Sequence, residues 1–103
     1  VAEGGYFLKE DVSKWDAPFF ATSPVEARAI DPQQRILLEV AYESLENAGI
    51  PIEKISNTET ACFVGGFTND YKKIVTQDIH ATPQYAITGT AVSMLANRVS
   101  WFL

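Results

Sequence analysis

Residues 31–51 read DPQQRILLEVAYESLENAGIP and predict the longest helix of the chain. Asp31 is a favourable N-cap, Pro32 fits the first helical position, and Gln34 lies three residues after the cap, where its side chain can complete a capping box. Gly49 is suited to end the helix in a left-handed conformation, and Pro51 prevents it from resuming. Between these signals, apolar residues recur at helical spacing and predict a core-facing stripe: Leu37, Leu38, Ala41, Leu45 and Ala48, widened by Ile36 and Val40.

Two shorter helices are predicted on either side of this one. Ser23 as N-cap and Pro24 at the first helical position indicate one or two turns that end near Ile30. The polar residues at the start of the segment 68–75 can cap a second short helix.

A last helix is predicted over residues 90–101, which read TAVSMLANRVSW. This sequence leaves almost no polar face, and a helix that is apolar all round is normally buried. We therefore expect it to lie inside a large domain or at a subunit contact.

Residues 60–64 read TACFV and predict a β-strand that ends at Gly65 and Gly66. The segment is β-branched, aromatic and nearly apolar throughout, which is typical of a strand covered on both faces. Together with the helices, this strand indicates a layered α/β structure.

The composition is typical of a globular core. The chain has 103 residues, of which 47% are hydrophobic, and a net charge of −5. An acidic balance without a basic patch disfavours nucleic acid and anionic membranes as partners. Cys62 is the only cysteine, so no disulfide can form within the chain, and a cytoplasmic location is expected. No apolar stretch approaches the ~18–20 residues that cross a bilayer.

The two ends of the chain predict a piece of a larger domain. The chain begins at Val1 without an initiator methionine, and it finishes on the apolar residues Trp101, Phe102 and Leu103. A chain of this size buries only about 60–65% of its unfolded surface. We expect such a piece to be marginally stable and sticky in isolation.

Four motifs together resemble the opening of a single enzyme domain. They are DAPFF at residues 16–20, SPVEA at 23–27, DPQQRILLE at 31–39 and ENAGIP at 46–51. FVG at 63–65, NDY at 69–71, TGT at 88–90 and LANRVS at 95–100 are similar to later parts of the same domain. On these residues the chain resembles the amino-terminal part of the ketosynthase (β-ketoacyl synthase) domain of type I polyketide synthases. FTNDY at 67–71 is most similar to the iterative reducing synthases of fungi.

The resemblance implies an α/β fold of the thiolase-like type, in which two five-stranded mixed sheets and helices form α/β/α/β/α layers. Residues 1–103 would be a partial ketosynthase domain that supplies part of the first half and is truncated before the nucleophile. The parent protein implied by the resemblance is a homodimer.

The resemblance also implies an acyltransferase reaction. A cysteine takes an acyl group from the phosphopantetheine arm of an acyl carrier protein and joins it to a carrier-bound malonyl unit by decarboxylative Claisen condensation. Two histidines would assist the decarboxylation. These catalytic residues are expected beyond Leu103, so the 103 residues alone are expected to be inactive.

Three alternatives stay open at this point. A fatty acid synthase type of ketosynthase would use the same mechanism. A non-catalytic ketosynthase-like domain would only gate the channel or set chain length. A free-standing binding domain is disfavoured by the apolar end of the chain.

Cys62 and His80 are predicted not to be catalytic. Thr60, Ala61 and Cys62 repeat the tripeptide that precedes the nucleophile of the family, but Phe63 follows within a predicted strand, where a thiol among apolar groups is inert. A packing role is therefore favoured over a reactive one. His80 has no second ligand nearby in the sequence, so it is predicted to be a turn or surface residue, and no metal site is predicted.

Two groups of residues are candidates for a functional site. By resemblance, one group borders the substrate channel, with a tight turn or core packing as the alternative: Gly65, Gly66, Phe67, Thr68 and Met94. The other group is assigned to a dimer interface or to structural contacts within the domain, because polar groups in an apolar helix need partners: Asn97, Arg98 and Trp101.

Overall fold

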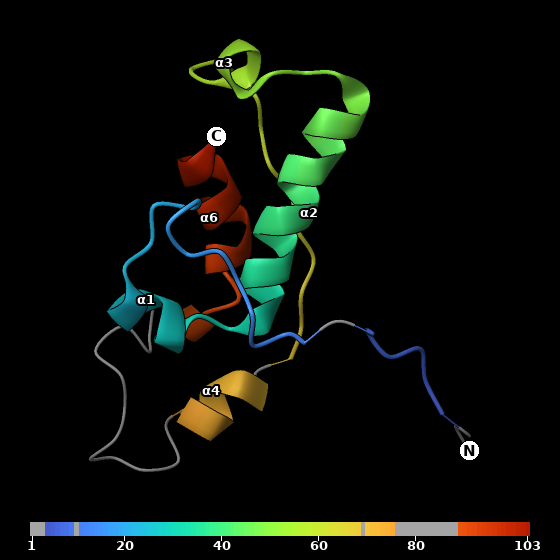
Figure 1. Ribbon diagram of the computed structural model, residues 1–103, viewed down its shortest axis with the longest axis vertical. Coiled ribbons are helices and arrows are strands. Elements are labelled where there is room, and N and C mark those ends of the chain that lie inside the picture. The colour runs from blue at the N-terminus through green and yellow to red at the C-terminus, as the bar shows by residue number, and fades with distance from the viewer. Residues whose placement is uncertain (1–3, 10, 69, 76–88) are drawn as a thin grey trace.

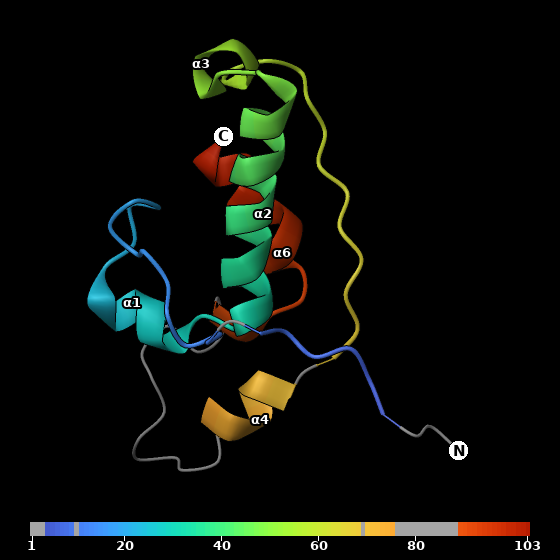
Figure 2. The same cartoon turned by 45° about the vertical axis from the view of Figure 1, so that its right-hand side comes forward.

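The computed structural model describes residues 4–9, 11–68, 70–75 and 89–103, and these residues form helices joined by extended segments (Figure 1). The helices are α1 (Pro24–Ala29), α2 (Pro32–Ala48), α3 (Ile52–Ile55), α4 (Asp70–Val75) and α6 (Met94–Phe102). α2 and α6 pack side by side, with α1 at one end of this pair and α3 near the other (Figures 1 and 2). None of the helices in the described ranges is long and apolar enough to span a membrane.

The helix caps predicted for α1 and α2 are confirmed. Ser23 caps α1 and Asp31 caps α2, each by accepting a hydrogen bond from a backbone N–H of the first turn. Gly49 ends α2 with a φ of 71°. The capping box predicted for Gln34 is wrong: this side chain donates to the carbonyl of Ala91, in the segment before α6.

The apolar stripe of α2 is buried only in part. Leu38 is 4% exposed and forms the centre of the core with Phe20 and Val99. Val40 and Ala48, which were predicted to belong to the stripe, are exposed. Val40 lies two residues after Leu38, about 200° further round the helix, so it faces away from α6. The partly buried neighbours of the core are Trp15, Leu37, Ala41, Cys62, Phe102 and Leu103.

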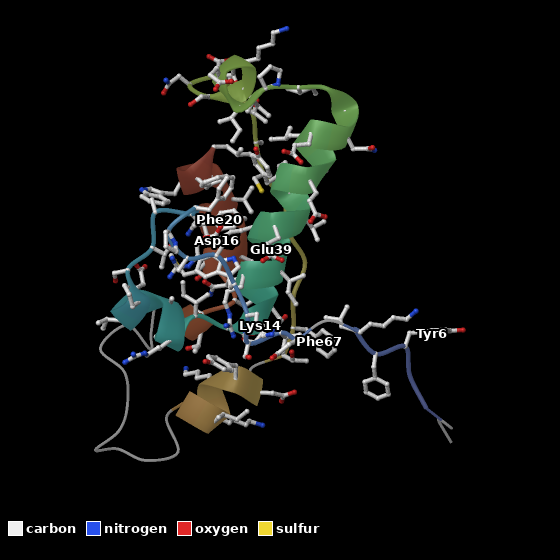
Figure 3. The ribbon with its side chains drawn as sticks, viewed as in Figure 1. Tyr6, Lys14, Asp16, Phe20, Glu39 and Phe67 are labelled. Carbon is white, nitrogen blue, oxygen red and sulfur yellow. The ribbon has the colours of Figure 1, made fainter. Side chains whose placement is uncertain are left out.

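Five aromatic rings attach the segment before α1 to α2 and α6. The ring of Phe20 stacks on Trp15 at 5.2 Å between centroids and contacts Phe102 at 4.9 Å. Phe19 contacts Tyr42 edge-on at 4.9 Å. Figure 3 shows Phe20 lying where α2 and α6 come together. Each such pair stabilises by about 0.5–1.5 kcal/mol beyond its buried area.

Two segments that are distant in sequence cross at the start of α2. The N–H of Asp31 donates to the carbonyl of Gly89 at 2.7 Å. A Cβ atom on Gly89 would lie 2.1 Å from the carbonyl oxygen of Ala29, so only glycine fits here. Ala29 and Ile30 are 0% exposed and Thr90 is 3% exposed. We call residues 29–31 and 89–90 the crossing.

α6 is shorter at its start than predicted. It begins at Met94 and not at Thr90, after a turn in which the carbonyl of Ala91 accepts a bond from the Met94 N–H at 3.0 Å and another from the Gln34 side chain at 3.3 Å. Within these residues the helix is covered on one side only, and Trp101 is 69% exposed. Burial of its other faces in a larger domain or at a subunit contact stays a prediction. The buried residues of α6 are Leu95 and Val99.

Residues 58–68, which we call the extended segment, run along α2 from α3 to α4 (Figure 2). Cys62 and Val64 are half-buried, whereas Phe63 between them is 93% exposed. This alternation is typical of an extended chain with one face against helices. Residues 60–64, which were predicted to form a strand covered on both faces, are extended but unpaired in this structure, since no backbone hydrogen bond joins them to another described segment.

The two remaining helices are short. α4 forms where it was predicted, and the hydroxyl of Tyr71 fixes it to α1 by donating to the carbonyl of Arg28 at 2.8 Å. α3 was not predicted from the sequence. Pro51 follows the end of α2, and its extended backbone serves as the N-cap position of α3.

Candidate functional site

A buried polar network joins α1, α2 and α6. Arg98 of α6 donates from Nη1 to Glu26 Oε1 of α1 at 3.1 Å and from Nε to Gln34 Oε1 of α2. Gln34 in turn donates from Nε2 to the carbonyl of Ala91 at 3.3 Å. Gln34 is 2% exposed, and the side chains of Arg98 and Glu26 are 11% and 29% exposed. Charge-assisted bonds with so little solvent are stronger than surface ones, so the network fixes how these helices meet.

A cavity of about 450 Å³ opens beside this network. Its walls combine a thioether and an indole with an amide and an ion pair, an arrangement suited to binding. Acid–base chemistry is not favoured there, because the guanidinium and the carboxylate are already paired with each other. Four of the lining residues were predicted for a site, Met94 for the channel and the other three, Asn97, Arg98 and Trp101, for an interface or structural contacts. The complete lining is Ala21, Thr22, Glu26, Met94, Asn97, Arg98 and Trp101.

The other residues predicted for the channel lie on the extended segment. Phe67 is 90% exposed, and a Cβ on Gly65 would have no neighbour within 4 Å. Gly66 and Thr68 are closer to the helices: Gly66 lies against α6, and Thr68 accepts hydrogen bonds from the first turn of α2. None of these four lines the cavity beside Met94, so the predicted channel residues form two groups.

Cys62 is half-buried against the core, and it lines a second cavity of about 370 Å³ between the extended segment and α6. Among the residues that the structure describes, no basic or acidic side chain lines this cavity. A thiol becomes a strong nucleophile when a base, a cation or a helix N-terminus stabilises its thiolate. The described surroundings of Cys62 therefore suit packing. The residues that line this cavity are Ile55, Ser56, Asn57, Thr58, Thr60, Cys62, Val99, Ser100, Trp101 and Leu103.

Arg98 has the partners that its burial requires, and they belong to the same chain. Asn97 is exposed, so water can satisfy its amide. Trp101 projects from the same helix and is 69% exposed. A role for these residues at a dimer interface stays a prediction.

Three residues of the site and its support were not recognised from the sequence. Gln34 was assigned to a cap, although a glutamine among apolar residues of a helix can also signal a buried polar contact. Glu26 stood in a short motif with no indication of a partner. Gly89 was noted only as part of a family motif, and its close contact with Ala29 depends on a long-range approach.

Arg35 is a second buried cation, at the start of α2. It is 9% exposed, its Nη1 donates to the carbonyl of Ser13 at 3.3 Å, and its guanidinium carbon lies 5.9 Å from the ring centre of Tyr71. Its Nε and the indole N–H of Trp15 are buried without a hydrogen-bond partner. These contacts indicate that Arg35 holds the N-terminal segment onto α2.

Two groups among the described residues have a displaced pKa, and both lie outside the two cavities. A hydrogen bond to Glu46 raises the pKa of Tyr42, and the bonds that Asp11 accepts from Ser13 lower the pKa of its carboxyl group. His80 lies outside the described residues. Within the described ranges, no three His, Cys, Asp or Glu side chains gather as metal ligands.

The family model described as "Beta-ketoacyl synthase, N-terminal domain" matches residues 1–103, which is the whole chain. The chain belongs to the β-ketoacyl synthase family. The match confirms the family predicted from the motifs, and membership implies a thiolase-like fold. The described residues contribute only helices and extended segments to it.

Curated relatives of this ketosynthase chain include fungal polyketide synthases. A highly reducing polyketide synthase of Didymella fabae is 56% identical over 98 residues, which cover 95% of this chain and 5% of the relative. The hybrid PKS-NRPS synthetase pynA of Aspergillus niger is 52% identical over 101 residues, which cover 98% of this chain and 3% of the relative. The highly reducing polyketide synthase easB of Emericella nidulans is 51% identical over 100 residues, which cover 97% of this chain and 4% of the relative. The chain therefore spans about a twentieth or less of these relatives.

Proposed function

We propose that this chain is part of the ketosynthase of a fungal highly reducing polyketide synthase, an acyltransferase that forms carbon–carbon bonds. The observation that carries the proposal is the 56% identity to a highly reducing polyketide synthase over 95% of the chain. The family match over residues 1–103 supports the same assignment.

The proposed reaction has two steps. A cysteine thiolate attacks the acyl thioester on the phosphopantetheine arm of an acyl carrier protein, and the carrier thiol leaves with a proton. A second carrier brings a malonyl thioester, which loses CO₂ to give an enolate. The enolate carbon attacks the acyl-enzyme and expels the cysteine thiolate, so that the carrier holds a β-ketoacyl thioester.

The nucleophile in this proposal lies outside the 103 residues, shortly after α6, and the two histidines lie further on. The surroundings of Cys62 support this placement, since no charged or basic side chain among the described residues lines its cavity. The 103 residues alone are then inactive.

The extended segment is proposed to become a strand in the complete ketosynthase. Its exposed Phe63 and Phe67 form an apolar face, which in a soluble protein marks a contact still to be made. Strands of the remaining ketosynthase would cover it and complete the α/β/α/β/α layers. The complete enzyme is proposed to be a homodimer in the cytosol, with acyl carrier protein and with acyl and malonyl thioesters as partners.

The first test is to sequence the coding region beyond Leu103. A DTACSS-like segment followed by two family histidines is expected. If the cysteine is replaced, the domain is a non-elongating homologue that gates or scaffolds.

The second test loads the complete synthase with a radiolabelled acyl thioester and compares it with the variant Cys62→Ala. We expect both proteins to carry the label on the same peptide outside residues 1–103. Loss of the label in Cys62→Ala, with the protein still folded, would show that Cys62 is the nucleophile. If the proteins do not acquire any label, the condensing role is wrong.

A further inference from the structure

The gap between α1 and α6 is bridged by polar contacts. The cavity of about 450 Å³ lies between residues of both helices, so close packing does not set their separation at this point. The side chains around a void lose the dispersion contacts that would hold them in place. The ion pair between Arg98 and Glu26, at 3.1 Å, spans this region.

Gln34 couples this ion pair to the turn before α6. Its amide oxygen accepts from Arg98, and its amide nitrogen donates to the carbonyl of Ala91. Arg98 is in the middle of α6, whereas Ala91 lies in the turn that precedes the helix, three residues before Met94. One side chain of α2 therefore holds both α6 and the turn that leads into it, which restricts movement of α6 along its own axis.

We infer that Arg98, Glu26 and Gln34 are positioning residues for the condensing cysteine, an inference that rests on the proposed function. In that proposal the nucleophile follows α6, so the position of α6 determines where the thiolate meets the thioester carbonyl carbon. Misplacement of a reacting group by about 1 Å can slow a reaction by about a hundredfold. None of the three residues touches the reacting atoms in this account.

The test compares Arg98→Lys with the unaltered complete synthase. Lysine keeps the positive charge but cannot donate to Glu26 and Gln34 at once with the fork of a guanidinium. The assay follows the transfer of an acyl group from carrier thiol to cysteine thiol. Competent sites are counted by end-point alkylation with iodoacetamide, and the modified peptide is identified by mass spectrometry.

We expect Arg98→Lys to lower the turnover per competent site about tenfold or more, while KM for the acyl thioester changes less than about twofold. Glu26→Gln keeps an acceptor oxygen but loses the charge, so a smaller decrease is expected. Arg28→Lys is the matched control on the exposed side of α1 and should leave turnover per site unchanged.

A purely structural role would reduce the number of competent sites and leave turnover per site unchanged. That result in Arg98→Lys would overturn the inference. If Arg98→Lys does not fold, the same measurement is made on Glu26→Gln, and fewer competent sites with unchanged turnover per site would again overturn the inference. Failure of the unaltered synthase to form an acyl-cysteine would instead reject the proposed function, and this inference with it.

Discussion

The crossing and the extended segment differ in two respects: how deeply their apolar side chains are buried, and whether their backbone groups are hydrogen-bonded to distant segments. At the crossing, Ala29 and Ile30 are completely buried, and the backbone of Asp31 bonds to that of Gly89. In the extended segment, Phe63 is 93% exposed, and no backbone hydrogen bond links residues 59–68 to another described segment. The crossing thus finds its partners within these 103 residues, whereas the extended segment leaves a large apolar side chain exposed.

The largest difference in the free energy of unfolding is expected between alanine substitutions at two glycines, one from each region. Gly89→Ala places a Cβ 2.1 Å from a backbone oxygen that cannot move freely, so we expect a loss of more than about 4 kcal/mol in the free energy of unfolding. Gly65→Ala meets open space and should be neutral or stabilise by up to about 1 kcal/mol. Urea unfolding followed by tryptophan fluorescence measures both. Equal effects of the two substitutions would contradict the comparison.

The second difference in stability is expected between alanine substitutions at two phenylalanines. Phe20 is 4% exposed in the core, so Phe20→Ala should cost about 3–5 kcal/mol through lost burial and a cavity. Phe63→Ala should change the stability of the 103-residue chain by less than about 0.5 kcal/mol. Thermal unfolding of both variants measures this difference. In the complete ketosynthase, Phe63→Ala should become destabilising, and an unchanged effect there would contradict the proposed strand.

The third difference concerns two polar side chains. Asp31→Ala removes the cap of α2 at a residue that is 5% exposed and should cost about 1–2 kcal/mol. Thr58→Ala removes an exposed hydroxyl that bonds to the carbonyl of Ile55, and its expected cost is below about 0.5 kcal/mol. Helix content by circular dichroism across a urea titration measures both. If Thr58→Ala loses more stability than Asp31→Ala, the extended segment is held more firmly than its exposure indicates.

The last substitution concerns Gly66, where the extended segment meets α6. A Cβ on Gly66 would lie 2.7 Å from Leu95 Cδ1, the end of a flexible side chain that can rotate away. We therefore expect Gly66→Ala to cost about 1 kcal/mol, between the effects at Gly65 and Gly89. Hydrogen exchange of α6 amides measures the loosening. A cost as large as that of Gly89→Ala would mean that this contact is as rigid as the crossing.

Local sequence signals predicted the parts of the fold that depend on neighbouring residues. Ser23 and Asp31 cap their helices, and Gly49 ends α2, because each acts within one turn of its own position. The late start of α6 could not be predicted in this way. It follows a turn whose carbonyl, that of Ala91, is bonded to Gln34 from a distant helix.

The candidate site was predicted in part. Met94, Asn97, Arg98 and Trp101 were chosen individually, and the structure places them around one cavity. Their spacing of three, four and seven residues puts them on one face of α6, so helical periodicity could have grouped them. The approach of α1, which brings Glu26 to the same cavity, is not encoded by any local pattern. The strand at residues 60–64 was predicted from composition alone, but a strand forms only when another strand provides its hydrogen bonds.

The crossing also has a consequence for the order of folding during synthesis. α1 and α2 carry their own caps and can begin to form as soon as they leave the ribosome. The crossing can close only after Gly89 has been translated, because Asp31 bonds to its carbonyl. Contacts between residues so far apart in sequence are slow to form and leave apolar surface exposed in the meantime. We therefore expect nascent chains that stop before residue 89 to bind chaperones, and chains that extend past α6 to be released from them.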